Sequence, residues 1–201
     1  MEQKDFSFSN FFSSPGCFLN IGANSGMDTT YELLLNGWRG IYVDSNPFAF
    51  MDLHKRVQPY LDKVSFINSL VVPNKHDTSV TLFTSPYNHG MSSILPDWFG
   101  TQGNITSESF KHLIELKSKA FKVEELFDII GYDIDYINID TEGLCSELVM
   151  DLPIEKLSRL KVIEYETSTP SSREFLNTYG FGLFVKKINW IMVRGGVSSL
   201  T

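Results

Sequence analysis

A short turn of small residues, placed between an apolar stretch and a helical stretch, constrains this chain more than any other feature. The apolar residues Cys17–Ile21 predict a strand, and the turn Gly22–Gly26 leads at once into a helix beginning near Thr29. Glycine permits the sharp turn and leaves room for a ligand against the main chain. The free amide groups at a helix start favour a negatively charged group. This order of elements indicates an α/β domain with a ligand at the turn.

A second predicted strand, Gly40–Val43, carries Asp44 to its carboxyl end. Asp44 follows the last glycine of the turn by 18 residues. This is close to the roughly 20-residue spacing at which an acidic side chain accepts hydrogen bonds from a ribose. The spacing predicts a site for a nucleoside-containing cofactor. The alternative is that Gly22 and Gly26 make only a tight connection, in a domain whose ligand lies elsewhere or is absent.

Strand and helix patterns alternate from residue 17 to residue 180, which predicts a parallel sheet with helices on both faces. Val64–Val72 is predicted to form the third strand, with Asn68 and Ser69 near the carboxyl edge where such sheets bind ligands. Two closing strands, at 181–187 and 190–194, are joined by a short turn and are therefore predicted to be antiparallel.

Helix boundaries are predicted from capping patterns and apolar faces. Thr29 with Glu32, and Ser171 with Glu174, match the capping box in which two side chains satisfy free amides at a helix start. Leu35 is expected on the buried face of the first helix.

Composition narrows the classes of partner. The chain has 201 residues, enough for one sizeable core, and its formal net charge is −7. An acidic chain has no broad positive field for a phosphate backbone, so nucleic acid is not expected as a partner. No stretch is long and apolar enough for a bilayer and the first residues are too polar for a secretory signal, so we expect no membrane partner and a cytoplasmic location. Cys17 and Cys145 are expected to be reduced thiols.

Two irregular segments flank or interrupt the predicted domain, which spans residues 17–201. Residues 1–16 hold several phenylalanines, and we expect an arm that packs on the domain or makes a homo-oligomer with a second subunit. An inserted loop at about 85–106 is rich in aromatic residues and glycine, which favours an ordered substrate lid. His89 in this loop is a candidate base, although a lone histidine is more often a packing or surface residue.

Acidic residues follow two predicted buried strands. Asp140 ends the strand Tyr136–Asp140, Glu142 comes two residues later, and Glu166 lies near the end of the next strand. Asp140 and Glu142 are the candidate general bases, which requires partial burial and a raised pKa. Asp140 and Glu166 are also a candidate Mg²⁺ pair, but no supporting pattern accompanies them and we predict no metal.

With these landmarks placed, the chain resembles the FkbM family of S-adenosylmethionine-dependent methyltransferases. The matching segments are LNIGANSG at Leu19–Gly26, YVDSNP at Tyr42–Pro47, GMSSI at Gly90–Ile94 and YINIDTEG at Tyr136–Gly143, followed by a helix with Glu147. The resemblance implies a class I methyltransferase fold: a Rossmann-like three-layer sandwich with a mostly parallel seven-stranded sheet and an antiparallel C-terminal hairpin.

The resemblance also implies a cofactor, S-adenosylmethionine, and the residues that would hold it. The turn would lie against its methionine half, Asp44 would hold the ribose hydroxyls with Ser45 beside it, Asn68 and Ser69 would border the adenine, and Asp140 would stand near the sulfonium. The turn residues are Gly22, Ala23, Asn24, Ser25 and Gly26. The expected reaction is O-methylation of a hydroxyl on a small molecule, sugar or glycan.

Two positions depart from the family pattern and leave other functions open. Asn20 stands where an acidic residue is usual, and Asn138 where a lysine is frequent. A catalytically degenerate methyltransferase fold that binds a partner is therefore the main alternative. An NAD-dependent oxidoreductase is less favoured, because the turn lacks the third glycine of the dinucleotide fingerprint.

Overall fold

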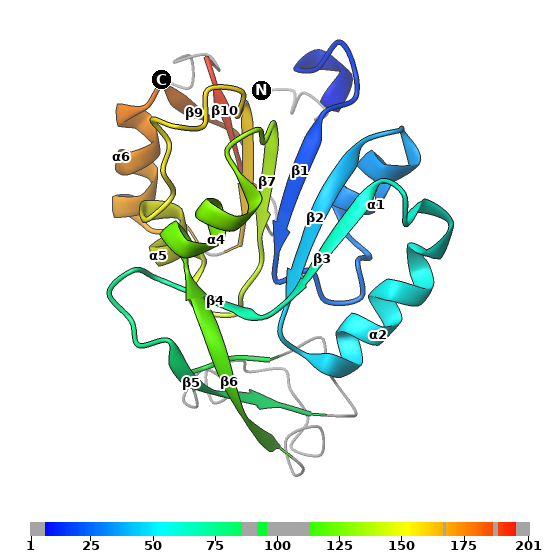
Figure 1. Ribbon diagram of the computed structural model, residues 1–201. Helices are drawn as coiled ribbons and strands as arrows, with labels where there is room; N and C mark the ends of the chain where they lie inside the picture. Colours follow the sequence, from blue (N-terminus) through cyan, green and yellow to red (C-terminus); the bar gives the residue numbers. More distant parts are fainter. Residues whose placement is uncertain (1–6, 86–91, 96–112, 167, 187–188, 196–201) are drawn as a thin grey trace.

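A computed structural model describes residues 7–85, 92–95, 113–166, 168–186 and 189–195. Its centre is a seven-stranded sheet in the order β3-β2-β1-β7-β8-β10-β9 (Figure 1). Neighbouring strands from β3 to β8 are parallel, and β10 is antiparallel to both β8 and β9. This confirms the predicted mostly parallel sheet with its antiparallel C-terminal hairpin.

The central strands have the composition that a sheet covered on both faces requires. All residues of β1 (Cys17–Ile21), β7 (Tyr136–Ile139) and β8 (Val162–Tyr165) are buried. Strands buried on both faces are continuously apolar rather than alternating. The outer strands of the sheet are β2 (Arg39–Asp44), β3 (Val64–Asn68), β9 (Phe181–Lys186) and β10 (Trp190–Arg194).

Helices cover both faces, and successive strand residues point alternately into two cores. One face carries α1 (Thr29–Leu35) and α2 (Pro47–Arg56), and the other carries α4 (Val123–Ile130), α5 (Cys145–Met150) and α6 (Pro170–Thr178) (Figure 1). Phe18 packs in the core under α1, whereas Leu19 packs in the core under α4 and α5. No helix in the described part of the chain has the length and apolar character to span a bilayer.

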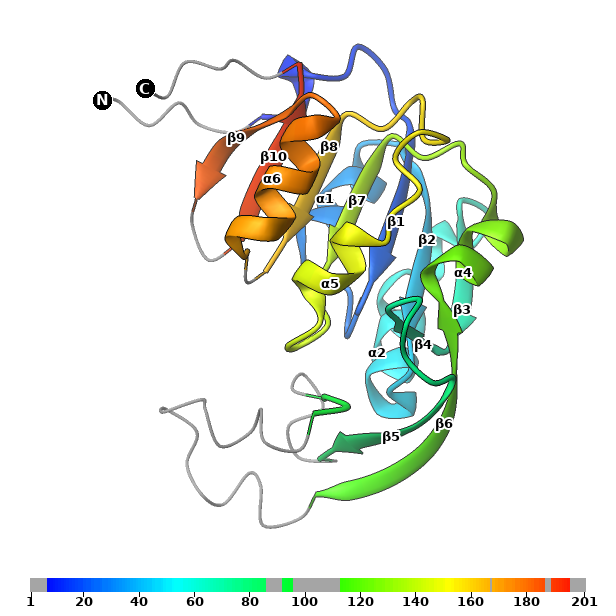
Figure 2. The same ribbon diagram turned by 90° about the vertical axis from the view of Figure 1, so that its left-hand side faces the viewer.

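A second, three-stranded sheet was not predicted. Its order is β4-β6-β5, formed by Leu70–Val72, Ile114–Lys122 and Ser79–Thr84, and it lies beyond the carboxyl ends of the main sheet (Figure 2). The predicted single strand Val64–Val72 is therefore wrong. It breaks at Ser69, whose hydroxyl bonds the carbonyls of Leu70 and Lys119 as the chain passes from one sheet to the other.

Several helix-end predictions also need correction. Asp28, not Thr29, is the N-cap of α1, and its carboxylate accepts a hydrogen bond from the Thr30 amide at 2.8 Å. Thr169 and Ser172, not Ser171 and Glu174, make the capping box of α6. Leu35 is exposed, because α1 ends there and its buried face consists of Thr30, Leu33 and Leu34.

The described part of the N-terminal arm packs on its own domain. Residues 8–10 form a short 3-10 helix. The Phe12 ring packs against Trp38, with ring centroids 4.8 Å apart, and the Phe11 ring packs against Phe184, with centroids 5.3 Å apart. Buried aromatic contacts of this kind hold the arm against the sheet. An oligomer formed through the arm stays a prediction.

Candidate functional site

A pocket lies at the carboxyl ends of β1, β2 and β7, where ligands bind in parallel sheets. Its enclosed volume is about 80 Å³, within about 650 Å³ of empty space when the part open to solvent is included. Ligand pockets usually measure roughly 300–1,000 Å³, so a nucleoside requires the enclosed part to widen. The residues that line it include Gly22, Asn24, Asp44, Ser45, Asn46, Ser69, Ser92, Ser93, Asp140, Thr141 and Glu142.

The glycine turn packs too tightly for side chains at two positions. Gly22 has a φ of +80°, and a Cβ there would lie 1.8 Å from the carbonyl oxygen of Asp140. Gly26 has a φ of +69°, and its Cβ would lie 2.5 Å from Leu53. These glycines let the end of β1 approach both β7 and α2. The turn thereby holds its pocket-facing backbone in a fixed position.

Asp44 lies directly opposite the turn. Its carboxylate accepts hydrogen bonds from the backbone amide of Asn24 at 2.6 Å and from that of Asn46 at 2.7 Å. These bonds fix the orientation of the Asp44 carboxylate at the pocket wall. The turn and the carboxylate thus border one pocket, as their spacing in the sequence predicts.

The other predicted cofactor residues divide into two groups. Ser45 and Ser69 line the pocket with Asp44. Asn68 is exposed, and its amide donates to the main-chain carbonyl of Asp44 at 3.0 Å, so it supports the strand end. Within the turn, Ala23, Ser25 and Gly26 are not among the described lining residues. Ala23 is buried in the core, and the Ser25 carbonyl accepts a bond from Arg56.

Residues from the second sheet close over the pocket, and the sequence did not reveal them. The Asn46 amide donates to the hydroxyls of Thr84, on β5, and Ser92, at 3.0 and 2.9 Å. Ser93 pairs with β5 and donates its hydroxyl to the Glu142 carbonyl at 2.8 Å. Of the predicted lid, the described residues Ser92, Ser93 and Ile94 line the pocket. That the loop is a substrate lid stays a prediction. His89 lies outside the described residues.

Two non-glycine residues in the described chain have positive φ angles, and both line the pocket. Asn24 has a φ of 46° and Glu142 a φ of 43°. Residues other than glycine rarely adopt this left-handed backbone conformation, and it persists where the surrounding structure enforces it. Each residue presents backbone polar groups at the pocket wall.

Carboxylates gather at the β7 and β8 side of the pocket. Burial, followed by repulsion from the nearby Glu166 carboxylate and a hydrogen bond with it, raises the pKa of Asp140 to about 7. Burial also raises the pKa of Glu142 to about 8, with Asp140 and Glu166 as the next causes. Both groups therefore exchange protons near neutral pH, as a general base requires. The predicted burial of these candidates is present.

One cluster has the atoms to hold a metal ion. Asp140, Cys145 and Glu166 each offer a ligand atom, and these atoms all lie within 4.8 Å of one another. Burial raises the pKa of the Cys145 thiol to about 12, and its sulfur accepts a hydrogen bond from the Thr141 amide at 3.3 Å. In this arrangement Cys145 is a protonated packing residue rather than a nucleophile.

Asn20 and Asn138, the two residues that depart from the family pattern, belong to a buried hydrogen-bond network. Asn20 donates to the Asp28 carboxylate at 2.6 Å and to the Thr30 hydroxyl at 2.9 Å, and accepts from Asn138 at 3.1 Å. Burial raises the pKa of Asp28. The acidic side chain missing at position 20 is present eight residues later, on the N-cap of α1, where Asn20 and Thr30 both donate hydrogen bonds to it.

No protein-family model and no curated protein matches this sequence. Several solved structures share its architecture. Precorrin-6y C5,15-methyltransferase from Geobacter metallireducens GS-15 has 14% identity and a TM-score of 0.46, over 90% of this chain and 79% of that one. Ribosomal protein L11 methylase from Lactobacillus delbrueckii subsp. bulgaricus has 12% identity and a TM-score of 0.48, over 92% and 73%. M. capricolum TrmK, solved with S-adenosylhomocysteine, has 12% identity and a TM-score of 0.43, over 94% and 67%.

Identities this low and TM-scores below 0.5 establish neither a family nor an activity for this chain. The strand order and pairing define the fold by themselves: an α/β Rossmann-like sheet with an antiparallel hairpin at its end.

Proposed function

We propose that this chain is an S-adenosylmethionine-dependent methyltransferase that methylates a hydroxyl group on a small molecule, sugar or glycan. One observation carries the proposal: the turn from Gly22 to Asn24, the carboxylate of Asp44 and the carboxylate of Asp140 border a single pocket. The resemblance to the FkbM family supports the same cofactor and class of acceptor.

The charge of the pocket fits this cofactor better than a dinucleotide. Asp44, Asp140 and Glu142 line it, and no lysine, arginine or histidine is among its described lining residues. The Asp44 carboxylate, and Asp140 and Glu142 when deprotonated, attract the positive sulfonium and ammonium groups of S-adenosylmethionine and repel the pyrophosphate of NAD. The oxidoreductase alternative is disfavoured on this ground.

Each residue then has a defined task. When bound, S-adenosylmethionine supplies a methyl group on an excellent leaving group. Asp44 accepts hydrogen bonds from the ribose hydroxyls, and the backbone of the turn bounds the methionine half. Asp140 or Glu142 accepts the proton of the acceptor hydroxyl, a contribution of about 10²- to 10⁴-fold in rate. Holding the acceptor in line with the methyl group supplies roughly 7–11 kcal/mol more.

A methyl-transfer assay tests the proposal. The purified chain is incubated with methyl-labelled S-adenosylmethionine and a panel of sugars, glycan fragments and small alcohols. We expect label on at least one hydroxyl, and about 10²-fold less with Glu142→Gln or Asp140→Asn, whichever is the base. Cofactor binding without transfer to any acceptor would favour the degenerate binding protein, and binding of NAD instead would favour the oxidoreductase.

A further inference from the structure

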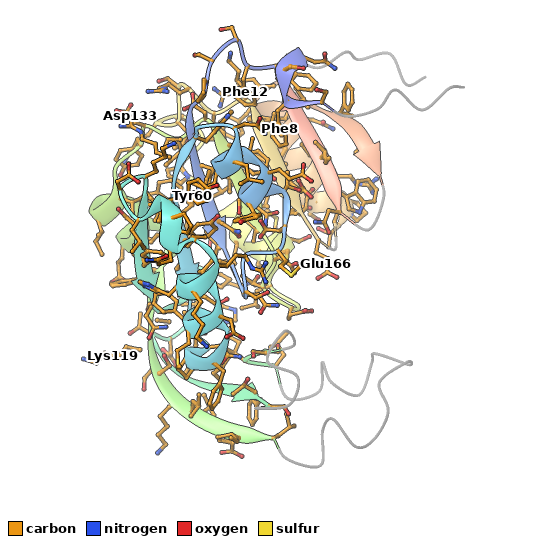
Figure 3. All side chains as sticks on the ribbon, turned by 90° about the vertical axis from the view of Figure 1, so that its right-hand side faces the viewer. Phe8, Phe12, Tyr60, Lys119, Asp133 and Glu166 are labelled. Carbon is orange, nitrogen blue, oxygen red and sulfur yellow. The ribbon has the colours of Figure 1, made fainter. Side chains whose placement is uncertain are left out.

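The larger of the two cavities described here lies away from the candidate active site. It has a volume of about 630 Å³, between the N-terminal arm, α1 and the strands β8 and β10. Residues that line it include Phe8, Phe12, Thr29, Glu32, Trp38 and Glu164. Figure 3 shows Phe8 and Phe12 near the top of the view, and Glu166, which directly follows β8, near its middle. The volume lies within the usual range for a small-molecule site.

A buried carboxylate without a counter-ion lies in the wall of this cavity. Only 7% of Glu164 is exposed, and its oxygens accept hydrogen bonds from the Tyr136 hydroxyl at 2.6 Å and the Asn189 amide at 2.9 Å. Within the described chain, no lysine, arginine or histidine makes a salt bridge with Glu164. Both donors are neutral, since burial raises the pKa of Tyr136 well above its ordinary value. Buried charges in proteins are normally paired, so this one calls for a cation.

Aromatic rings also line the cavity. The Phe8 ring lies 6.3 Å from that of Trp38 and 5.2 Å from that of Tyr136, between centroids, and Phe12 lies 4.8 Å from Trp38. The faces of such rings attract cations. Phe12 already does so, because the Lys161 ammonium lies 5.4 Å above its ring. Lys161 is not among the residues that line the cavity.

We propose that this cavity is a second ligand site, which binds a small organic cation between the carboxylate of Glu164 and the rings of Phe8, Phe12 and Trp38. The ligand class is an alkylammonium or quaternary ammonium compound: the charge pairs with Glu164 and the alkyl groups contact the rings. A buried carboxylate beside aromatic faces selects a cation over a neutral molecule of the same shape.

Choline and its uncharged isostere 3,3-dimethylbutan-1-ol are the probes, titrated into the whole chain by calorimetry. We expect choline to bind at least tenfold more tightly than the isostere. Glu164→Gln keeps the shape of the side chain and should weaken choline binding at least tenfold. Glu174→Gln is the matched control: Glu174 is exposed on α6 and does not line the cavity, so its loss should change the affinity less than threefold.

Any of three results would overturn the proposal. The two probes could bind equally well, Glu164→Gln could bind choline as tightly as the wild type, or choline at millimolar concentration could fail to bind. Should Glu164→Gln not fold, nuclear Overhauser contacts between the choline methyls and the rings of Phe12 and Trp38 decide instead. Asp44→Ala should bind choline as the wild type does, whatever happens to its affinity for S-adenosylhomocysteine. Failure of this site and failure of the proposed function are therefore distinguishable.

Discussion

At the scale of single residues, Asn20 shows how a departure from a family pattern can be part of a consistent local design. Its side-chain amide donates to the carboxylate of Asp28 and the hydroxyl of Thr30, and its oxygen accepts from Asn138. An acidic residue at position 20 would face Asp28 at hydrogen-bond distance. The asparagine and the N-cap aspartate therefore depend on each other.

Restoring the family's acidic residue should destabilise the protein. Asn20→Asp removes two donated hydrogen bonds and adds a buried like charge, so we expect the free energy of unfolding to fall by about 1–3 kcal/mol at pH 7. Urea unfolding measures it. Part of the loss should return at pH 5, where the two carboxyls can share a proton. The matched control is Asn10→Asp at an exposed position, expected to stay within about 0.5 kcal/mol. An unchanged stability of Asn20→Asp would contradict the network.

The raised pKa values of Asp140 and Glu142 have a consequence for stability. In the folded state these carboxyls keep their protons up to about pH 7 and pH 8, whereas in the unfolded chain they lose them near pH 4. Between these limits the folded state binds more protons. The free energy of unfolding should therefore decrease as the pH rises from about 4 to about 8.

Glu142→Gln tests this origin of the pH dependence. The variant removes one of the two titrating groups and leaves Asp140, whose pKa is raised by burial and by Glu166, in place. Its melting temperature should fall less steeply than that of the wild type between pH 4 and pH 8. Matching slopes for the two proteins would show that Glu142 is not the group responsible.

At the scale of elements, Asn46 joins the main sheet to the second sheet. Its oxygen accepts from the Phe48 amide as the N-cap of α2, while its amide group bonds Thr84 on β5 and Ser92. One side chain therefore fixes the start of a helix and the position of the residues that close over the pocket.

Two substitutions separate these roles. Asn46→Ser can still cap α2 but cannot reach β5, whereas Asn46→Ala loses both contacts. We expect Asn46→Ala to cost about 1 kcal/mol more than Asn46→Ser in the free energy of unfolding, the usual worth of an N-cap. Hydrogen exchange of the β5 amides should be faster than in the wild type in both variants. Wild-type exchange rates on β5 in Asn46→Ala would show that the link does not hold the second sheet.

The elements that the sequence predicted correctly are those with a strong local cause. The buried strands around Leu19 and Ile137 follow from continuous apolar runs, and the turn follows from Gly22 and Gly26. The passage of the chain from the main sheet to the second sheet at Ser69 was missed, because apolar residues continue on both sides of this position. The cap at Asp28 was missed because a threonine and a glutamate nearby match a commoner pattern.

At the scale of the whole molecule, alternation of strands and helices was sufficient to predict the main sheet, because right-handed parallel crossings leave few other topologies. The second sheet depends instead on the pairing of β6 with β4 and with β5, both of which are far from β6 along the chain, and such pairing has no local signal. The sequence predicted that Asp44 and the turn share a pocket, but not that Asn46, beside it, bonds Thr84 and Ser92.

The central claim concerns this pocket, and calorimetric titration with S-adenosylhomocysteine tests it most directly. Asp44→Asn, which keeps the shape of the side chain, serves as the variant, and NAD as the competing ligand. The account predicts that the wild type binds S-adenosylhomocysteine and not NAD. It also predicts that Asp44→Asn binds about 10- to 100-fold more weakly, the worth of one charged hydrogen bond. Tight NAD binding, or equal affinities of the wild type and Asp44→Asn for S-adenosylhomocysteine, would contradict it.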